Sequence, residues 1–334
     1  MAPTKTLTRR RKACYALAVW LVIALVAYTI SLVVRVPRLY WDLKAGAPRG
    51  AVPADHVFDE VLGWRPAPGP SAWTGILHDE GGFRIPKTPK PDRAGRPLVL
   101  CLGCSFTYGS CAEHPWPEVL GDRLDARVVN GGVGGWGLVQ MLLRARKLIP
   151  ELHPDWVVVQ ASPWLADRSQ SPLAAHRFGY NPQPWFAPDL AIVPPSRPPR
   201  ATFRLTEWRS SDSSLGDFLD FVPTGVQAVI WQDRLVASTV FARSAPREEI
   251  EVAAYREIAA LARGRASAVV VVNRECLGAD AEARRLVEEL RPILPVVDCG
   301  LHSAAKRLEA PDGHPDDEGQ ALIAAWAVTT VGMR

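Results

Sequence analysis

The chain has 334 residues, 48% of them hydrophobic, so it can bury a sizeable core and forms one large domain or two small ones. Six of the 39 basic residues precede Val36 without any acidic residue, and the rest of the chain carries 33 basic and 35 acidic residues. The formal charge of +4 therefore comes from the N-terminus, and the remainder lacks the basic excess that nucleic-acid-binding proteins need.

An uncharged apolar run occupies residues 14–34, and the basic cluster RRRK at residues 9–12 lies just before it. Its 21 residues cross a hydrocarbon core of about 30 Å at about 1.5 Å per residue. The run exceeds the apolar stretch of a cleaved signal peptide, and the residues that follow it, Arg35 to Arg38, make a poor cleavage site. We predict a basic cytoplasmic tail (residues 1–13), a transmembrane signal anchor (residues 14–36) and an extracytoplasmic remainder.

Residues 37–94 are rich in proline and glycine and show no clear periodicity, which predicts a connector that packs on the following domain. Two runs stand out in it, LGWRP at residues 62–66 and GGFR at residues 81–84. We expect both to be irregular segments whose aromatic side chains contact the domain.

Strand and helix patterns alternate from residue 97 onwards. The predicted strands cover residues 98–102, 127–130, 155–161, 266–273 and 295–298, and the predicted helices cover residues 116–124, 138–149, 247–263, 279–290 and 316–331. A helix can also start at residue 106 and run to residue 124. Right-handed crossovers between such elements give a three-layer αβα sandwich with about five parallel strands, over residues 95–334.

A long insertion interrupts this alternation at residues 162–245, where prolines are frequent. Its tryptophans argue against disorder. Residues 215–240 are expected to form a helix, packed either beside the functional site or near the membrane.

Six cysteines are present, and one of them, Cys14, lies in the predicted span. Export would permit a disulfide between Cys104 and Cys111 or between Cys276 and Cys299. Buried thiols are the alternative, above all for residues in strand-like runs such as Cys299 and Cys101. No cysteine and histidine spacing indicates a metal site, and no cofactor is expected.

Ser105 follows the strand at residues 98–102 almost at once, where open α/β sheets place their ligands. Far along the chain, Asp312 and His314 precede the last helix. A serine hydroxyl needs a base within hydrogen-bond reach to act as a nucleophile, and the two need not be close in sequence. The glycine cluster at residues 131–137 could instead bind phosphate, but dinucleotide spacing and a Walker lysine are both missing.

Three sequence blocks resemble those of the SGNH/GDSL hydrolases: GCSFTYG at residues 103–109, NGGVGGWG at residues 130–137 and DGHP at residues 312–315. The resemblance implies a flavodoxin-like SGNH fold with Ser105 as nucleophile, His314 as general base and Asp312 as the carboxylate that orients it. It also implies an oxyanion hole formed by the backbone N–H groups of Ser105 and Gly135.

Three positions depart from the family pattern. Cys104 stands where the family has an aspartate, and Asp312 precedes the histidine by two residues rather than three. The third block, at residues 160–167, lacks the asparagine that donates to the oxyanion, so Ser162 or the indole N–H of Trp164 is the candidate replacement.

The expected protein is therefore a membrane-anchored esterase or acyltransferase outside the cytoplasmic membrane. The resemblance implies that it acts on O-acyl groups, in particular O-acetyl groups, of a cell-envelope glycan or lipid. The alternative is a weak or inactive scaffold subunit of an envelope polysaccharide system, which the departures at Cys104 and in the third block favour.

Overall fold

The computed structural model describes residues 9–44, 56–71, 74–87, 93–176, 179–198, 214–273, 280–299 and 313–331. The chain divides into two compact units. One consists of Met1–Ala51 with Pro199–Asp233, and the other consists of Val52–Pro198 with Arg234–Arg334. We describe the larger unit first.

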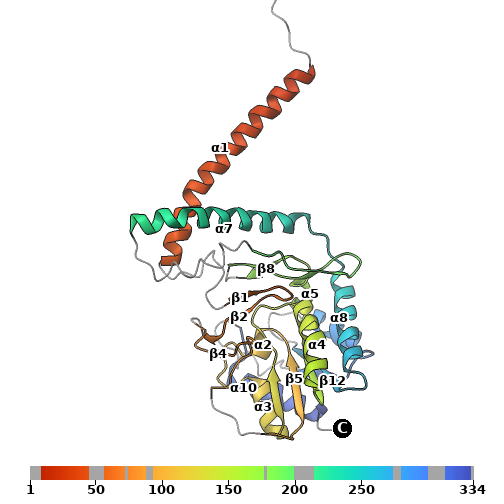
Figure 1. Cartoon of the computed structure of the whole chain (residues 1–334). Helices are drawn as coiled ribbons and strands as arrows, with labels where there is room; N and C mark the ends of the chain where they lie inside the picture. Colours follow the sequence, from red (N-terminus) through yellow and green to blue (C-terminus); the bar gives the residue numbers. More distant parts are fainter. Residues whose placement is uncertain are drawn as a thin grey trace, which may run out of the picture. The chain divides into compact units, whose positions relative to one another are not determined.

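A five-stranded parallel sheet forms the centre of the larger unit (Figure 1). Its strands are β5 (Leu98–Leu102), β6 (Arg127–Asn130), β7 (Trp156–Ala161), β12 (Ser267–Asn273) and β13 (Val296–Cys299). The spatial order is β13-β12-β7-β5-β6, and every neighbouring pair is parallel. From β6 onwards the strands thus follow the order 2-1-3-4-5 of flavodoxin-like sheets, which confirms the predicted fold class.

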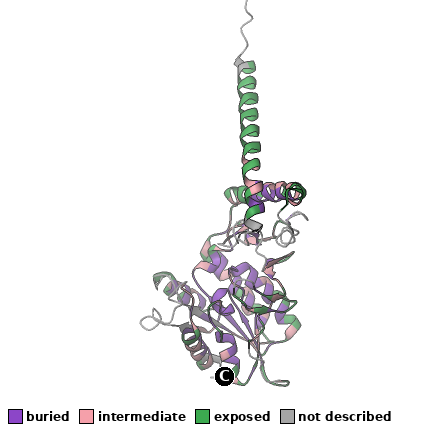
Figure 2. Cartoon of the chain, turned by 90° about the vertical axis from the view of Figure 1, so that its left-hand side faces the viewer, coloured by how far each residue is buried: buried purple, intermediate pink, exposed green. Residues whose placement is uncertain are grey.

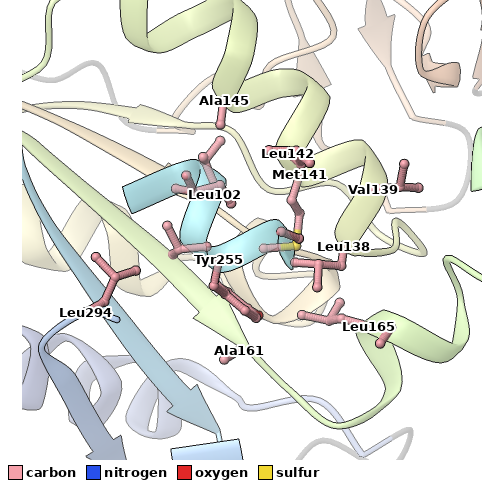
Figure 3. Packing of buried hydrophobic residues seen from close by; sticks show 14 of the residues in the cluster. Leu102, Leu138, Val139, Met141, Leu142, Ala145, Ala161, Leu165, Tyr255 and Leu294 are labelled. Atoms are coloured by element: carbon pink, nitrogen blue, oxygen red, sulfur yellow. The ribbon is translucent and has the colours of Figure 1, made fainter. Parts of the chain in front are cut away.

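Helices cover both faces of this sheet, because alternate residues of each strand point to opposite sides. Leu100 and Leu102 of β5 join the hydrophobic cluster made with α4 (Leu138–Leu152), α8 (Arg247–Ala262) and α9 (Asp280–Leu290). Val99 and Cys101 join the opposite cluster, made with α3 (Trp116–Leu124) and α10 (Asp317–Val331). Figure 3 shows the first cluster, in which Leu138, Met141 and Leu142 of α4 gather near Tyr255 of α8. The three-layer αβα sandwich is thereby confirmed.

Residues 106–124 differ from the continuous helix that could start there. Helix α2 (Ser105–Tyr108) is a single turn, and Gly109 ends it in the left-handed region at φ 73°. The chain then forms a loop up to Pro115, the N-cap of α3. A left-handed residue followed by a loop stops the helical hydrogen bonding, so two short helices replace one.

The connector contains more regular structure than expected. Two short antiparallel hairpins form there, one from β1 (His56–Asp59) and β2 (Gly63–Pro66), the other from β3 (Gly69–Pro70) and β4 (Leu77–His78). The aromatic residues of both sequence runs do contact the body: the rings of Trp64 and Trp136 lie 6.3 Å apart, and Phe83 packs against Arg144.

The predicted insertion begins with α5 (Trp164–Asp167). Two hairpins follow, formed by β8 (Leu173–His176) with β9 (Gly179–Pro182) and by β10 (Trp185–Phe186) with β11 (Ile192–Val193). The predicted helix is present as α7 (Leu215–Phe241). Cys104 and Cys111 are not joined in a disulfide, and Cys276 lies outside the described residues.

The smaller unit contains α1 (Arg9–Lys44), a single helix that extends beyond the predicted end of the anchor at residue 36. Its segment Ala13–Trp41 is long and apolar enough to cross a membrane, and most of its side chains are exposed (Figure 2). The helix continues through Pro37 because Val36, Leu39 and Tyr40 pack against α7, and this contact outweighs the local helix-breaking tendency.

Candidate active site

Ser105 is the first residue of α2 and lies three residues after the end of β5. Its side chain is nearly buried, with 7% of its surface exposed. The turn between strand and serine is tight: a Cβ atom at Gly103 would overlap the side chains of Thr107 and Gln160. The sequence therefore folds into a sharp strand-to-helix turn that holds the hydroxyl at the carboxyl edge of the sheet.

The second glycine block lies directly beside this turn. A Cβ atom at Gly134 would be 3.9 Å from the Cβ of Ser105, and one at Gly132 would overlap the backbone nitrogen of Tyr108. Gly135 has φ 86°, a conformation that favours glycine. The structure thus brings the block that contains Gly135 next to Ser105.

Asn130 fixes the start of that loop. Its Nδ2 donates to the carbonyl oxygen of Thr107 at 3.0 Å, and its Oδ1 accepts from the N–H of Gly132 at 3.0 Å. One side chain therefore joins the serine turn and the glycine loop.

His314 lies against the same turn from the far end of the chain. Its ring centroid is 5.3 Å from that of Phe106, the residue after the serine. Helix α10 is fastened nearby, because Gln320 Nε2 donates to the carbonyl oxygen of Phe106 at 3.2 Å and Gln320 Oε1 accepts from the N–H of Trp116 at 2.7 Å. The serine and histidine segments are therefore neighbours, while Asp312 lies outside the described residues.

The two candidate replacements for the missing asparagine follow β7. Trp164 packs on Phe106 with ring centroids 5.4 Å apart, and its indole nitrogen is buried and has no hydrogen-bond partner among the described residues. Ser162 is buried, and its oxygen accepts from Gln160 Nε2 at 2.9 Å. Phe106 thus has Trp164 and His314 as aromatic neighbours.

Gln160 is a positioning residue that the sequence did not single out. Its Oε1 accepts from the N–H of Cys104 at 3.0 Å and from Thr107 Oγ1 at 2.9 Å, and its Nε2 lies 3.1 Å from Cys104 Sγ. The amide thus supplies a hydrogen-bond acceptor to the turn that holds Ser105. A glutamine at the end of an otherwise apolar strand was the available signal.

Arg84, from the GGFR run, holds the loop that follows the serine turn. Its guanidinium donates to the carbonyl oxygens of Tyr108 (2.9 Å), Gly109 (2.6 Å), Ala112 (2.9 Å) and Glu113 (3.0 Å). Burial lowers the pKa of Arg84, and the nearby carboxylate of Glu118, 3.8 Å away, opposes that shift.

Arg144 holds the glycine loop in a similar way. Its guanidinium lies 4.4 Å from the ring centroids of both Phe83 and Trp136 and donates to the carbonyl oxygen of Gly131 at 3.0 Å. Burial lowers its pKa to about 9, although Asp59 and Asp79 act in the opposite direction. The sequence drew attention to the GGFR run that contains Arg84, but it gave no signal that either arginine is buried.

A cavity of about 420 Å³ lies beside Arg84 and the loop that Arg84 holds. Ile76, Leu77, Ile85 and Lys87 line it together with Ser110 to Glu113, so it contains none of the predicted site residues. Within the described ranges, no group of three or more histidine, cysteine, aspartate or glutamate residues could hold a metal ion.

No family model and no curated protein matches the chain. Solved structures similar to it include a member of the lipolytic protein G-D-S-L family from Veillonella parvula DSM 2008, with 14% identity over 71% of this chain and 99% of that chain and a TM-score of 0.37. A catalytic mutant of an acetylxylan esterase from Geobacillus stearothermophilus has 14% identity over 71% and 94% of the two chains and a TM-score of 0.40.

An alpha/beta hydrolase enzyme from the metagenome of Lake Arreo, Spain, has 15% identity over 72% of this chain and 96% of that chain, with a TM-score of 0.39. These TM-scores are low. The assignment of the fold class therefore rests on the strand order and the two helix layers of this chain.

Proposed function

We propose that this chain is a serine esterase or acyltransferase that uses Ser105, His314 and Asp312. The observation that carries the proposal is the meeting of three distant segments: the serine turn, the glycine loop and the histidine segment all lie around Phe106 and Ser105. An alcohol, an imidazole and backbone N–H groups at one sheet edge are what acyl transfer requires.

In the first step, Ser105 Oγ attacks the acyl carbonyl carbon while His314 accepts the hydroxyl proton. Asp312 orients the imidazole and stabilises its charged form. The tetrahedral oxyanion accepts hydrogen bonds from the N–H groups of Ser105 and Gly135, each contributing about 3 kcal/mol in comparable sites. Collapse breaks the ester C–O bond, and His314 returns the proton to the leaving alkoxide.

We assign the third oxyanion donor to the indole N–H of Trp164. This N–H is buried and has no acceptor among the described residues, so it is able to donate a hydrogen bond to bound substrate. Ser162 already accepts a hydrogen bond from Gln160, yet its own O–H remains the alternative donor.

In the second step, water or a sugar hydroxyl attacks the acyl carbon of the acyl-enzyme while His314 accepts its proton. The bond between the acyl carbon and Ser105 Oγ then breaks, and His314 returns the proton to Ser105 Oγ. Water gives a hydrolase and a sugar hydroxyl gives an acyltransferase. We propose an O-acetylated glycan or lipid of the cell envelope as the substrate, because helix α1 carries a candidate membrane span and the basic cluster before it favours an extracytoplasmic body. We also propose that the protein is part of an envelope biosynthesis complex.

The test uses the full chain in detergent, a fluorophosphonate probe and p-nitrophenyl acetate. We expect a covalent adduct on Ser105 and acetate release, both abolished by Ser105→Ala with an unchanged melting temperature. Ser110→Ala, in the same loop, is the matched control and should retain both signals. Undiminished turnover of Ser105→Ala would refute the assignment.

The second candidate is a non-catalytic scaffold with the same fold, which Cys104 and the absence of an asparagine at residues 160–167 favour. It predicts no adduct and no acetate release from a protein that melts cooperatively. Ping-pong kinetics with an added sugar acceptor would instead identify a transferase.

A further inference from the structure

Helices α1 and α7 form the packed part of the smaller unit, and Figure 1 shows α7 crossing α1 near the C-terminal end of α1. On the α1 side, the contact involves Leu32, Val36, Leu39 and Tyr40. Arg35 lies in the middle of this contact and is the first charged residue after the uncharged run at residues 14–34. Helix α7 therefore meets α1 at the level where α1 leaves the apolar segment.

One side of α7 is apolar along its length in this unit. With about 100° between successive residues, five aliphatic side chains fall within an arc of about 80°; they are Leu215, Leu219, Val222, Val226 and Ile230. We call this set the α7 stripe. Its first two members, Leu215 and Leu219, are 73% and 58% exposed. Exposed aliphatic side chains that continue an apolar side of a helix form contiguous apolar surface, which marks an interaction site.

The polar side chains of α7 lie on the flank of this stripe. Asp220 and Gln227 are exposed and fall on a separate face of the helix. On the side that packs against α1, Phe221, Ala228 and Val229 are buried. The α7 stripe borders this contact, because Val222 and Val226 also pack against the cluster formed with α1. It is exposed at its N-terminal end, at Leu215 and Leu219. A helix with an apolar side and a separate polar side is the type that lies in a membrane surface.

Asp233 lies one further helical step along the same side of α7 and is the one charged residue on that side within this unit. Its carboxylate accepts hydrogen bonds from Arg35 at 2.8 and 3.0 Å and from the Tyr28 hydroxyl at 2.9 Å. Both partners belong to α1, so the negative charge on the apolar face is compensated by the helix that enters the membrane.

We infer that the α7 stripe rests on the phospholipid surface and gives the protein a second membrane contact beside α1. This inference rests on the proposed function in one respect, the insertion of α1 as a membrane anchor. Phospholipid is the occupant because the stripe belongs to the same packed unit as α1 and meets α1 where its first charged residue, Arg35, follows the apolar run. In addition, Arg35 of α1 compensates the charge of Asp233. Acyl chains then cover Leu215 and Leu219 while Asp220 and Gln227 face headgroups and water.

The experiment places the photoreactive residue benzoylphenylalanine at single positions of the full chain, reconstituted in vesicles of phosphatidylethanolamine and phosphatidylglycerol. The test positions are 215 and 219, and the matched control positions are 220 and 227. All four side chains are exposed, so none of the replacements disturbs the contact with α1. Position 25, an exposed leucine of α1, reports insertion of the anchor.

We expect phospholipid adducts at positions 25, 215 and 219, with a yield at 215 and 219 that exceeds the yield at 220 and 227 by about tenfold. Equal yields at the test and control positions, with position 25 labelled, would overturn the inference and leave the anchor intact. Adducts to a second protein chain at 215 and 219 would overturn it in favour of a protein partner. Failure at position 25 would reject the anchor itself, and the inference with it.

Discussion

The serine side and the histidine side of the candidate site are held by different kinds of contact. On the serine side, two buried arginines, Arg84 and Arg144, donate to backbone carbonyls of the two loops around Ser105. On the histidine side, the start of α10 is attached by neutral or surface hydrogen bonds. The N–H of His114 donates to Asp317 Oδ1, and Gln320 Nε2 donates to the carbonyl oxygen of Phe106.

Because of this difference, substitutions on the two sides should affect stability and catalysis to different extents. Removing a buried charged group leaves its partners unsatisfied, so changes on the serine side should lower stability and activity together. His314 is only partly buried, so its replacement should affect the reaction far more than the fold. Four substitutions test this contrast.

The largest effect is expected for His314→Gln. Loss of the proposed general base should reduce p-nitrophenyl acetate turnover by about 10³-fold or more, while the melting temperature stays close to that of the wild type. His114→Gln is the control, because the side chain of His114 is exposed and only its backbone N–H is used. Turnover that survives His314→Gln would remove the histidine from the mechanism.

Arg84→Met should be the most destabilising change on the serine side. It leaves four carbonyl oxygens without their donor and Glu118 buried without its cation. We expect a loss of about 3 to 5 kcal/mol in the free energy of unfolding, measured by urea denaturation in detergent, with activity lost in parallel.

The control for Arg84→Met is Arg146→Met, which removes an exposed ion pair with Glu257. It should cost less than about 1 kcal/mol. Similar losses for the two variants would mean that Arg84 does not fix the loop.

Gln160→Leu should cost about 2 kcal/mol, because it leaves the N–H of Cys104 and the hydroxyl of Thr107 without their acceptor in a buried turn. Activity should fall further than stability explains, since Ser105 follows Cys104 directly. Gln170→Leu, which removes one half-buried hydrogen bond to Ala245, is the matched control. A stable and active Gln160→Leu protein would show that the serine turn does not depend on this amide.

The smallest effect is expected for Tyr255→Phe, which removes the hydrogen bond from Tyr255 to the carbonyl oxygen of Gln160 at 2.9 Å. The cost at pH 7 should be about 1 kcal/mol. Burial raises the pKa of Tyr255 well above its usual value of 10.0, so above pH 10 the unfolded chain loses this proton while the folded chain keeps it.

Stability of the wild type should therefore fall as the pH rises above 10, and its advantage over Tyr255→Phe should vanish near pH 11, since one pKa unit is worth about 1.4 kcal/mol. Urea unfolding of both proteins between pH 7 and pH 11 measures the difference. A constant difference across this range would contradict the prediction.

The sequence by itself determined the αβα sandwich and the apolar segment of α1, and its three blocks indicated Ser105, Gly135 and His314 as candidate site residues. The short continuous apolar runs of buried strands and the helical apolar patterns are local, and so are the glycine-rich turns that follow a buried strand, so they can be predicted without knowledge of the chain path. The end of α1 was predicted too early because packing against α7 extends the helix. The break in the helix after Ser105 was not predicted because it depends on the left-handed conformation of Gly109.

Only the tertiary structure decided which side chains hold the site together. Gln160 is 56 residues from Cys104, Arg84 is 24 residues from Tyr108, and Asp233 is 198 residues from Arg35. Such contacts depend on how the strands and helices are stacked, and an isolated glutamine or arginine carries no local mark of its distant partner. The same reason explains why the meeting of α1 and α7 could not be predicted from either helix alone.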